Sequence, residues 1–347
     1  MKNSIHGIEI DYVYGQDVET MDGRTLIDFT SGIFAANLGM HNMMVYTAIS
    51  EQLKNCMHSY QFDTPIKRAY LKALCEFTGF ESAYMFSSGT EATEAAYKIA
   101  RKHTGKPGVW GLNPAFHGKT LGAQIAAGRE NDWRNQTPGD KTGCLIFEPY
   151  VAATAKFHEQ KTIDRILSLV KEFNLILIAD EIQAGFGRTG KLFGYQHYPE
   201  VKPDIVCIGK GMCNGFPASA ILGPAELIDN PLMDLSSSNG GNPLACAAGM
   251  AVIEYFKRWN ILEMSAQMGH YFHAELSKLE QPVQGRGMVA SIWFPTVQEA
   301  DKAVVDLCAA GLLVVHTKGQ TIKLGPPLNI SKKALDDGIA ILRRVLS

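Results

Sequence analysis

Long hydrophobic runs are missing from this 347-residue sequence, and no stretch is apolar over enough residues to cross a bilayer. The opening residues also lack the apolar core of a signal peptide. Charge of one sign is not in excess, because 33 basic residues face 35 acidic ones and the formal net charge is -2. This balance offers no electrostatic attraction to nucleic acid or to an anionic membrane. We therefore expect neither as a partner.

Cysteine is sparse, with seven residues, an odd number, and no pair spaced as Cys-x-x-Cys. This pattern does not suggest a disulfide framework or a zinc site, so no metal is expected. Most cysteines, such as Cys144 and Cys207, lie in apolar runs and are interpreted as core thiols. Internal repeats and low-complexity segments are absent too. We expect a soluble, cytoplasmic protein of one large or two ordinary domains.

The most informative stretch covers residues 175–222, where two short apolar runs each stop at one charged residue. Asp180 ends the run LILIAD, and Lys210 follows the run DIVCIG. Runs this short, apolar on both faces and bounded by glycine, indicate buried parallel strands. Ligands of an open α/β sheet bind beyond the carboxyl ends of its strands. We therefore expect this carboxylate and this amine to share one site.

An amine and an acid in this arrangement suit Schiff-base catalysis with pyridoxal 5'-phosphate. The lysine forms the imine, and the acid keeps the pyridine nitrogen protonated so that the ring withdraws electrons. Taken singly, each residue has an ordinary interpretation, since Asp180 could cap a loop and Lys210 could be solvated. The two residues together favour the functional interpretation.

The residues around this pair resemble one family. DEIQAGFGRTG followed by IGKGMCNGFPASAILG is similar to the class III aminotransferases of the ornithine and 4-aminobutyrate type, which have fold type I of the pyridoxal-phosphate enzymes. The resemblance covers nearly the whole chain. It implies an α/β fold with a mainly parallel, seven-stranded-type sheet flanked by helices, plus a smaller α+β domain. The large domain would span residues 43–253, and the small domain residues 1–42 and 254–347.

Two motifs before Asp180 carry further site residues. SSGTEA places a Ser-Gly-Thr turn at the start of an alanine-rich helix, where N–H groups and the helix dipole attract an anion, and Ser88 with Glu91 matches a capping box. The resemblance implies that Phe116, in the motif FHG, stacks on the cofactor ring. It implies that the neighbouring His117 is a structural residue that forms a hydrogen bond. It also assigns the turn to the cofactor's phosphate: Ser88, Gly89 and Thr90.

The resemblance gives roles to four more residues. Glu148, in EPY, and Gln183, in DEIQAG, match positions near the phenolic edge of the ring. Ser238, aligned through GGNP, matches a threonine whose hydroxyl binds the phosphate of the neighbouring subunit, which implies a homodimer with shared sites. Lys210 would form the internal aldimine and later move the proton between the substrate carbon and the cofactor. Neighbouring positive charge and partial burial would lower its pKa.

Two departures from the family pattern concern the substrate. The family's Arg-x-x-Pro-Pro-Leu appears as KLGPPL, so Lys323 replaces the arginine that forks onto the carboxylate of glutamate and 2-oxoglutarate, and the usual glutamate loop is rewritten as YVAATAKF. Because ammonium lacks the planar fork of guanidinium, we predict that this substrate pair is not preferred. The alternative is that Lys323 binds a carboxylate adequately or is solvated. Phe34 either lines the substrate pocket or is a packed aromatic.

The predicted activity is transfer of an amino group from an amine or amino acid, expected to be an ω-amino donor, to an oxo acid or aldehyde. A decarboxylase, lyase or aminomutase stays open, because all begin with the same ring chemistry and differ in the bond that lies perpendicular to the ring. A non-catalytic relative that binds a ligand or partner is an alternative of another class. The intact Asp180 and Lys210 argue against it.

Overall fold

The computed structural model describes residues 8–60, 62–128, 138–317 and 319–347. Its largest sheet has the strand order β4-β11-β10-β9-β6-β5, and β11 runs against both of its neighbours while the other pairs are parallel. The sheet is therefore mainly parallel, as predicted, although six strands rather than seven lie in the described residues. The strands are β4 Ser82–Phe86, β5 Gly108–Gly111, β6 Thr142–Phe147, β9 Ile176–Asp180, β10 Ile205–Ile208 and β11 Ser219–Gly223.

The strands that carry the predicted site are buried on both faces. All residues of β10 are buried, and so are those of β9 apart from Ile176. Helix α4 packs across most of the sheet, because its many alanines allow a close approach. The helices of this region are α2 Met43–Leu53, α3 Pro65–Thr78, α4 Gly89–Thr104, α5 Leu121–Ala126, α6 Gln160–Phe173, α7 Ala225–Ile228 and α8 Pro243–Arg258.

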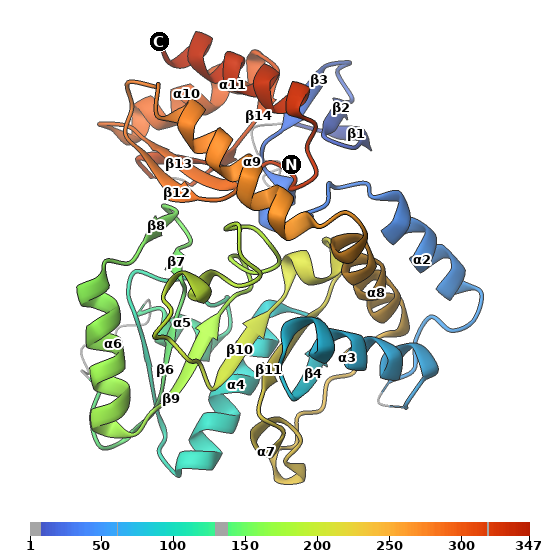
Figure 1. Ribbon diagram of the computed structural model, residues 1–347, viewed down its shortest axis with the longest axis vertical. Helices are drawn as coiled ribbons and strands as arrows, with labels where there is room; N and C mark the ends of the chain where they lie inside the picture. The colour runs from blue at the N-terminus through green and yellow to red at the C-terminus, as the bar shows by residue number, and fades with distance from the viewer. Residues whose placement is uncertain (1–7, 61, 129–137, 318) are drawn as a thin grey trace.

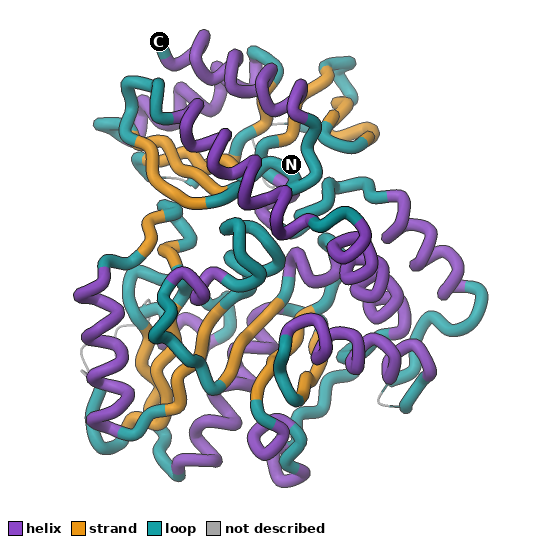
Figure 2. The backbone as a smooth tube through the Cα atoms, viewed as in Figure 1, coloured by secondary structure: helices purple, strands orange, loops and turns teal. Residues whose placement is uncertain are grey.

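Two four-stranded sheets form the other half of the molecule, which Figure 2 shows apart from the large sheet. The N-terminal meander is extended by β14, which pairs in parallel with β3, so both ends of the chain build one sheet (Figure 1). The strands are β1 Ile10–Tyr14, β2 Asp17–Thr20, β3 Thr25–Asp28, β12 Val283–Arg286, β13 Val289–Trp293, β14 Leu312–Leu313, β15 Val315–His316 and β16 Thr321–Leu324. The helices are α9 Ile261–Leu276, α10 Val297–Ala309 and α11 Lys332–Leu346.

The remaining elements are short. They are α1 Ser31–Phe34, β7 Tyr150–Val151, β8 Lys156–Phe157, and the 3₁₀ helices η3 Gly194–His197, η4 Lys210–Cys213 and η5 Pro231–Met233. The division into residues 43–253 against 1–42 with 254–347 stays a prediction, which the pairing of β3 with β14 supports. In the described parts of the chain, no helix is long and apolar enough to cross a membrane.

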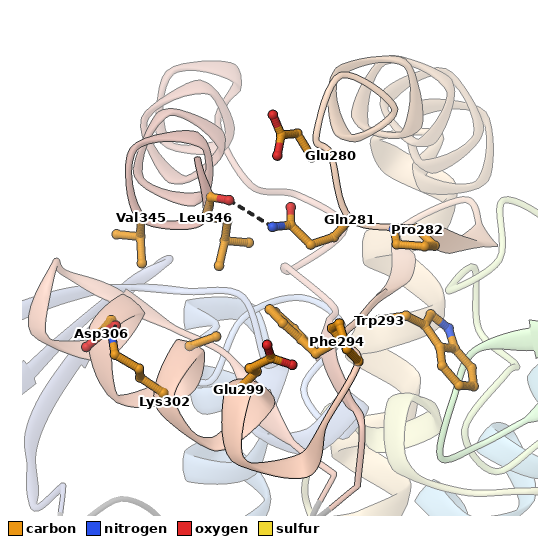
Figure 3. Close-up of a pocket in the computed structure, with 12 residues that line it drawn as sticks. Glu280, Gln281, Pro282, Trp293, Phe294, Glu299, Lys302, Asp306, Val345 and Leu346 are labelled. Carbon is orange, nitrogen blue, oxygen red and sulfur yellow. Dashed lines mark hydrogen bonds and ion pairs between the residues drawn. The ribbon is translucent and has the colours of Figure 1, made fainter.

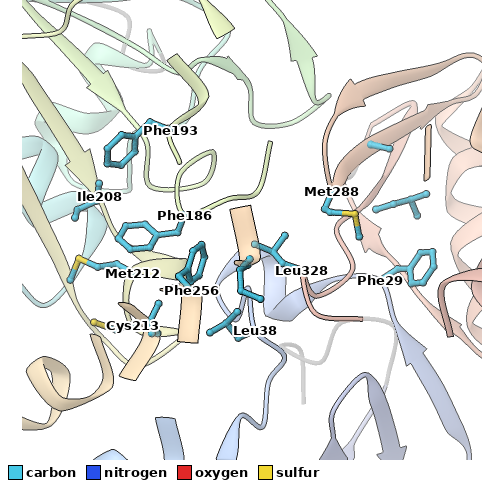
Figure 4. Close-up of a cluster of buried hydrophobic side chains, with 14 of the residues drawn as sticks. Phe29, Leu38, Phe186, Phe193, Ile208, Met212, Cys213, Phe256, Met288 and Leu328 are labelled. Carbon is cyan, nitrogen blue, oxygen red and sulfur yellow. The ribbon is translucent and has the colours of Figure 1, made fainter. Parts of the chain in front are cut away.

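A continuous core joins the halves next to the expected site. Figure 4 shows Phe186 and Met212, which follow β9 and β10, together with Leu38 from the N-terminal segment and Leu328 from the C-terminal part. All four side chains are buried. Residues far apart in the sequence therefore pack in one core. This core includes Met212, which lies two residues after Lys210.

Candidate active site

The structure brings the predicted acid and amine to one cavity at the carboxyl edge of the large sheet. Asp180 is the last residue of β9, and Lys210 begins η4 just after β10, which pairs in parallel with β9. The cavity has a volume of about 200 Å³. Its lining residues are Gly89, Thr90, Phe116, His117, Gly118, Glu148, Asp180, Ile182, Gln183 and Lys210.

Asp180 is held by a histidine and by its own loop. Oδ2 of Asp180 accepts a 2.7 Å hydrogen bond from Nδ1 of His117, and Oδ1 accepts one from the N–H of Ile182 at 3.1 Å. The carbonyl oxygen of His117 in turn accepts a hydrogen bond from the hydroxyl of Thr93 at 3.0 Å. His117 therefore orients the acid, which is the structural role expected from the sequence.

Glu148 lines the cavity together with Phe116. Its Oε2 accepts a 3.0 Å hydrogen bond from the N–H of Phe116, so the carboxylate fixes the backbone that carries the aromatic ring. Burial raises the pKa of the Glu148 carboxyl to about 7; His117 opposes this rise, and Asp180 adds to it. Phe116 keeps 38% of its surface exposed although it lines the cavity, so one side of this site is open.

The start of α4 differs from the predicted capping box. No side chain caps this helix, because the hydroxyls of Ser87 and Ser88 donate to Oε2 of Glu91 at 2.7 and 2.8 Å instead. The predicted capping box was wrong, because the backbone N–H of Ser87 also donates to the Glu91 carboxylate. The consequence is an N-terminus whose backbone N–H groups meet no capping side chain, at the end of the cavity lined by Gly89 and Thr90.

Lys210 is the amine of the site and has a strained backbone, with a φ of 43° in the left-handed region. Its Nζ forms no hydrogen bond with any residue in the described ranges. Burial lowers the pKa of Lys210, while Asp180 and Glu148 oppose this change. The expectation of a lowered pKa holds, but the cause is burial, because the charges that act on the amine are negative.

The two candidate substrate residues lie outside the cavity lining. Phe34 is 1% exposed and Lys323 is 3% exposed, and neither is among the lining residues. Nζ of Lys323 donates to the carbonyl oxygen of Ala152 and, at 2.8 Å, to Oε1 of Gln183. Burial lowers the pKa of Lys323 to about 7. Lys323 is thus neither solvated nor open to the cavity.

Electrostatic neighbours modify the pKa of Lys323. Glu148 opposes the lowering, whereas Lys210 and the buried Arg188 add to it. Arg188 itself donates to the carbonyl oxygens of Met288 and Pro326 at 2.8 and 2.6 Å, and so braces its loop against the C-terminal part. No carboxylate pairs with either cation among the described residues.

Ser238 is not among the residues that line the cavity of its own chain. It is exposed in the loop before α8. Sequence reasoning also missed two residues beside the site. Thr120 exchanges a 2.7 Å hydrogen bond with Thr90, and Tyr150 donates to Oε1 of Gln183 at 3.3 Å. Thr120 stands in none of the motifs described above, and Tyr150 was not singled out although it belongs to EPY.

A larger cavity of about 450 Å³ lies in the C-terminal half, between α10 and the end of α11 (Figure 3). Some of its polar side chains are engaged with one another and with backbone. Nζ of Lys302 pairs with Asp306 at 2.5 Å, and Nε2 of Gln281 donates to the carbonyl oxygen of Leu346 at 2.8 Å. None of the predicted site residues lines it, so the smaller cavity is the candidate active site.

The residues around the smaller cavity fit pyridoxal phosphate. Asp180, Phe116 and Lys210 supply the acid, the aromatic face and the amine that this cofactor requires. A Cβ atom at Gly118 would lie 2.2 Å from Oγ1 of Thr90, so glycine alone allows the close approach to the helix N-terminus where a phosphate binds. Nε2 of His117 is buried without a partner in the described residues. The fold and the cavity are those of a type I pyridoxal-phosphate enzyme.

Comparison with known proteins identifies the family. The profile of the class III aminotransferases matches residues 2–139 and 131–346. The acetylornithine aminotransferase of Aquifex aeolicus is 30% identical over 379 residues, covering 100% of this chain and 99% of that protein. That of Halalkalibacterium halodurans is 33% identical over 351 residues, covering 93% and 91%. An S-selective transaminase from Arthrobacter sp. has a TM-score of 0.90 at 24% identity, covering 100% and 94%, which shows the shared fold.

The chain belongs to the class III aminotransferase family and is a pyridoxal-phosphate-dependent aminotransferase. Its substrates are a small-molecule amino donor and an oxo acceptor. The comparisons give no support to a decarboxylase, a lyase, an aminomutase or a non-catalytic relative.

Proposed function

We propose that Lys210 is the residue that attaches the cofactor and transfers the proton during amino transfer. The observation that carries this role is that the Lys210 amine lines the same cavity as Asp180 and has no partner in the described residues. Pyridoxal phosphate, when bound, supplies a ring that withdraws electrons from the substrate carbon. Burial lowers the pKa of Lys210, which favours the free amine that a base requires.

The remaining lining residues would hold the cofactor. Asp180 would pair with the protonated ring nitrogen, and its bond to His117 keeps the carboxylate in place. Phe116 would stack on the ring, and Gln183 with Glu148 would lie at the phenolic edge. The phosphate would bind at the start of α4, where the dipole and the uncapped N–H groups favour an anion. The residues proposed there are Ser88, Gly89 and Thr90.

We also propose a homodimer in which Ser238 serves the cavity of the partner. Two observations support a second copy. Ser238 is exposed and does not line its own cavity. Large apolar side chains are exposed in residues 43–60 and at Phe62, with Met43 at 57%, Met57 at 62% and Phe62 at 78%. Exposed apolar side chains that lie together on a surface are typical of a protein–protein interface.

Mixing two variants tests the shared site. We expect Ser238→Ala to weaken binding of pyridoxal phosphate about tenfold, because a hydrogen bond to a charged group is lost. In a hybrid with Lys210→Ala, one cavity combines an intact Lys210 with an intact Ser238 and should regain the affinity of the wild type. A titration of the refolded mixture measures this. Hybrids that bind no better than Ser238→Ala would contradict the shared site.

For the substrate, we propose an ω-amino donor and an oxo acid or aldehyde acceptor, with the glutamate/2-oxoglutarate pair not preferred. The two curated relatives are named for acetylornithine. In this chain, however, Lys323 replaces the family arginine, and its Nζ donates hydrogen bonds to Ala152 and Gln183. At position 323 no planar fork is left for a substrate carboxylate.

A panel of donors tests this preference. We expect kcat/KM for glutamate to be roughly tenfold or more below that for the best ω-amine, because one charge-assisted bidentate contact is missing. Alanine and simple amines complete the panel, with a common oxo acid as acceptor. A strong preference for glutamate would contradict the proposed preference for an ω-amino donor.

The compartment proposed is the cytoplasm. All seven cysteines are free thiols, and five of them are buried. Unpaired thiols of this number agree with a reducing environment.

A further inference from the structure

Lys323 lies in β16 with its ammonium enclosed by the protein's own groups. Beyond the two hydrogen bonds to Ala152 and Gln183, its Nζ stands 4.3 Å from the centroid of the Phe34 ring, within the range of a cation–π contact. An ammonium has three N–H donors and no acceptor. Two oxygens and one ring face therefore account for its three donors, and the residue does not line the cavity.

Gln183 is held from one side by two donors. Lys323 and Tyr150, the latter only 1% exposed, both donate to its Oε1, at 2.8 and 3.3 Å. Because both donors meet Oε1, the amide oxygen of Gln183 faces Lys323 and Tyr150. Nε2 is then the free end of a side chain that lines the cavity, and it has no acceptor in the described residues.

We propose that Lys323 is a positioning residue, which together with Tyr150 fixes the Gln183 amide with its N–H donors toward the cofactor ring, and that it does not bind the substrate carboxylate. This inference rests on the proposed function of the cavity. The inference assigns one role to both departures from the family pattern, the lysine at position 323 and the rewritten loop YVAATAKF. This loop supplies the carbonyl of Ala152 and the hydroxyl of Tyr150. The lysine and the loop act on the same amide.

A double-mutant cycle on cofactor affinity tests this coupling. Pyridoxal phosphate is titrated into the cofactor-stripped protein and followed by its visible absorbance. We expect Lys323→Met to weaken binding roughly tenfold, because Gln183 loses the hydrogen bond that Lys323 donates to it. In a Gln183→Leu background the same substitution should change the affinity by less than about twofold. The exposed Lys302→Met serves as a control that leaves the affinity unchanged.

Tyr150→Phe provides a second variant that removes no charge, and we expect about threefold weaker binding from it, again only while Gln183 is present. The ratio of KM values for a donor with and without a carboxylate should stay the same in Lys323→Met. A KM raised for carboxylate donors alone, with the cofactor affinity retained, would overturn the inference. So would an equal loss of affinity in both backgrounds. Wild-type protein that binds no cofactor would instead overturn the proposed function, and this inference with it.

Discussion

Replacing Lys210 by alanine should lower the rate of amino transfer by roughly 10⁴-fold or more, because the amine both attaches the cofactor and carries the proton. The cofactor itself should still bind, since Asp180, Phe116 and the start of α4 are unchanged. Borohydride reduction of the wild type followed by mass spectrometry should place the added cofactor mass on the peptide that contains Lys210. The alanine variant should show no added mass.

Lys202→Ala is the matched control, because Lys202 is exposed and lies in the segment that leads into β10. Its activity should equal that of the wild type. If Lys210→Ala kept more than about a tenth of the activity, or if the cofactor mass appeared on another lysine, the assignment of Lys210 would be wrong.

Asp180→Asn should lower kcat by about 10²–10³-fold, because the neutral amide no longer stabilises positive charge on the ring nitrogen. Asparagine has the same shape, and its oxygen can still accept from the N–H of Ile182, while its NH2 group can donate to Nδ1 of His117 once the imidazole carries its proton on Nε2. The fold should therefore survive. Steady-state rates and the circular dichroism spectrum measure the two effects separately.

The exposed Asp164→Asn controls for the chemical change alone and should leave kcat unaltered. A loss of kcat in Asp180→Asn that disappeared when the variant was saturated with cofactor would show that the carboxylate serves binding only. That outcome would contradict its role at the ring nitrogen.

Much of the site was predictable because it depends on local patterns. The apolar runs before Asp180 and Lys210 are short and buried on both faces, so their assignment as parallel strands places both residues at one edge of the sheet. The Ser-Gly-Thr turn was found for the same reason, as the start of an alanine-rich helix. Its capping was wrong, because Ser87 competes for Glu91 and a motif that begins at Ser88 leaves that neighbour out.

The environment of Lys323 could not be predicted, because it is made by segments far apart in the chain. Ala152 comes from the turn between β7 and β8, Gln183 from the loop after β9 and Phe34 from the N-terminal part. The sequence shows the replacement of an arginine, but it does not show which oxygens meet the ammonium. Ser238 presents a similar limit, since its proposed partner lies in a second chain.

The most direct measurement is an absorption spectrum of the purified protein through one complete cycle of amino transfer. The visible band of bound pyridoxal phosphate should fade when an ω-amino donor is added, a near-ultraviolet band of the amino form should replace it, and an oxo acid should restore the first. The Lys210→Ala variant should fail to complete the cycle. A visible band that responds to the donor while carbon dioxide or ammonia is released, with no amino form, would contradict amino transfer in this cavity.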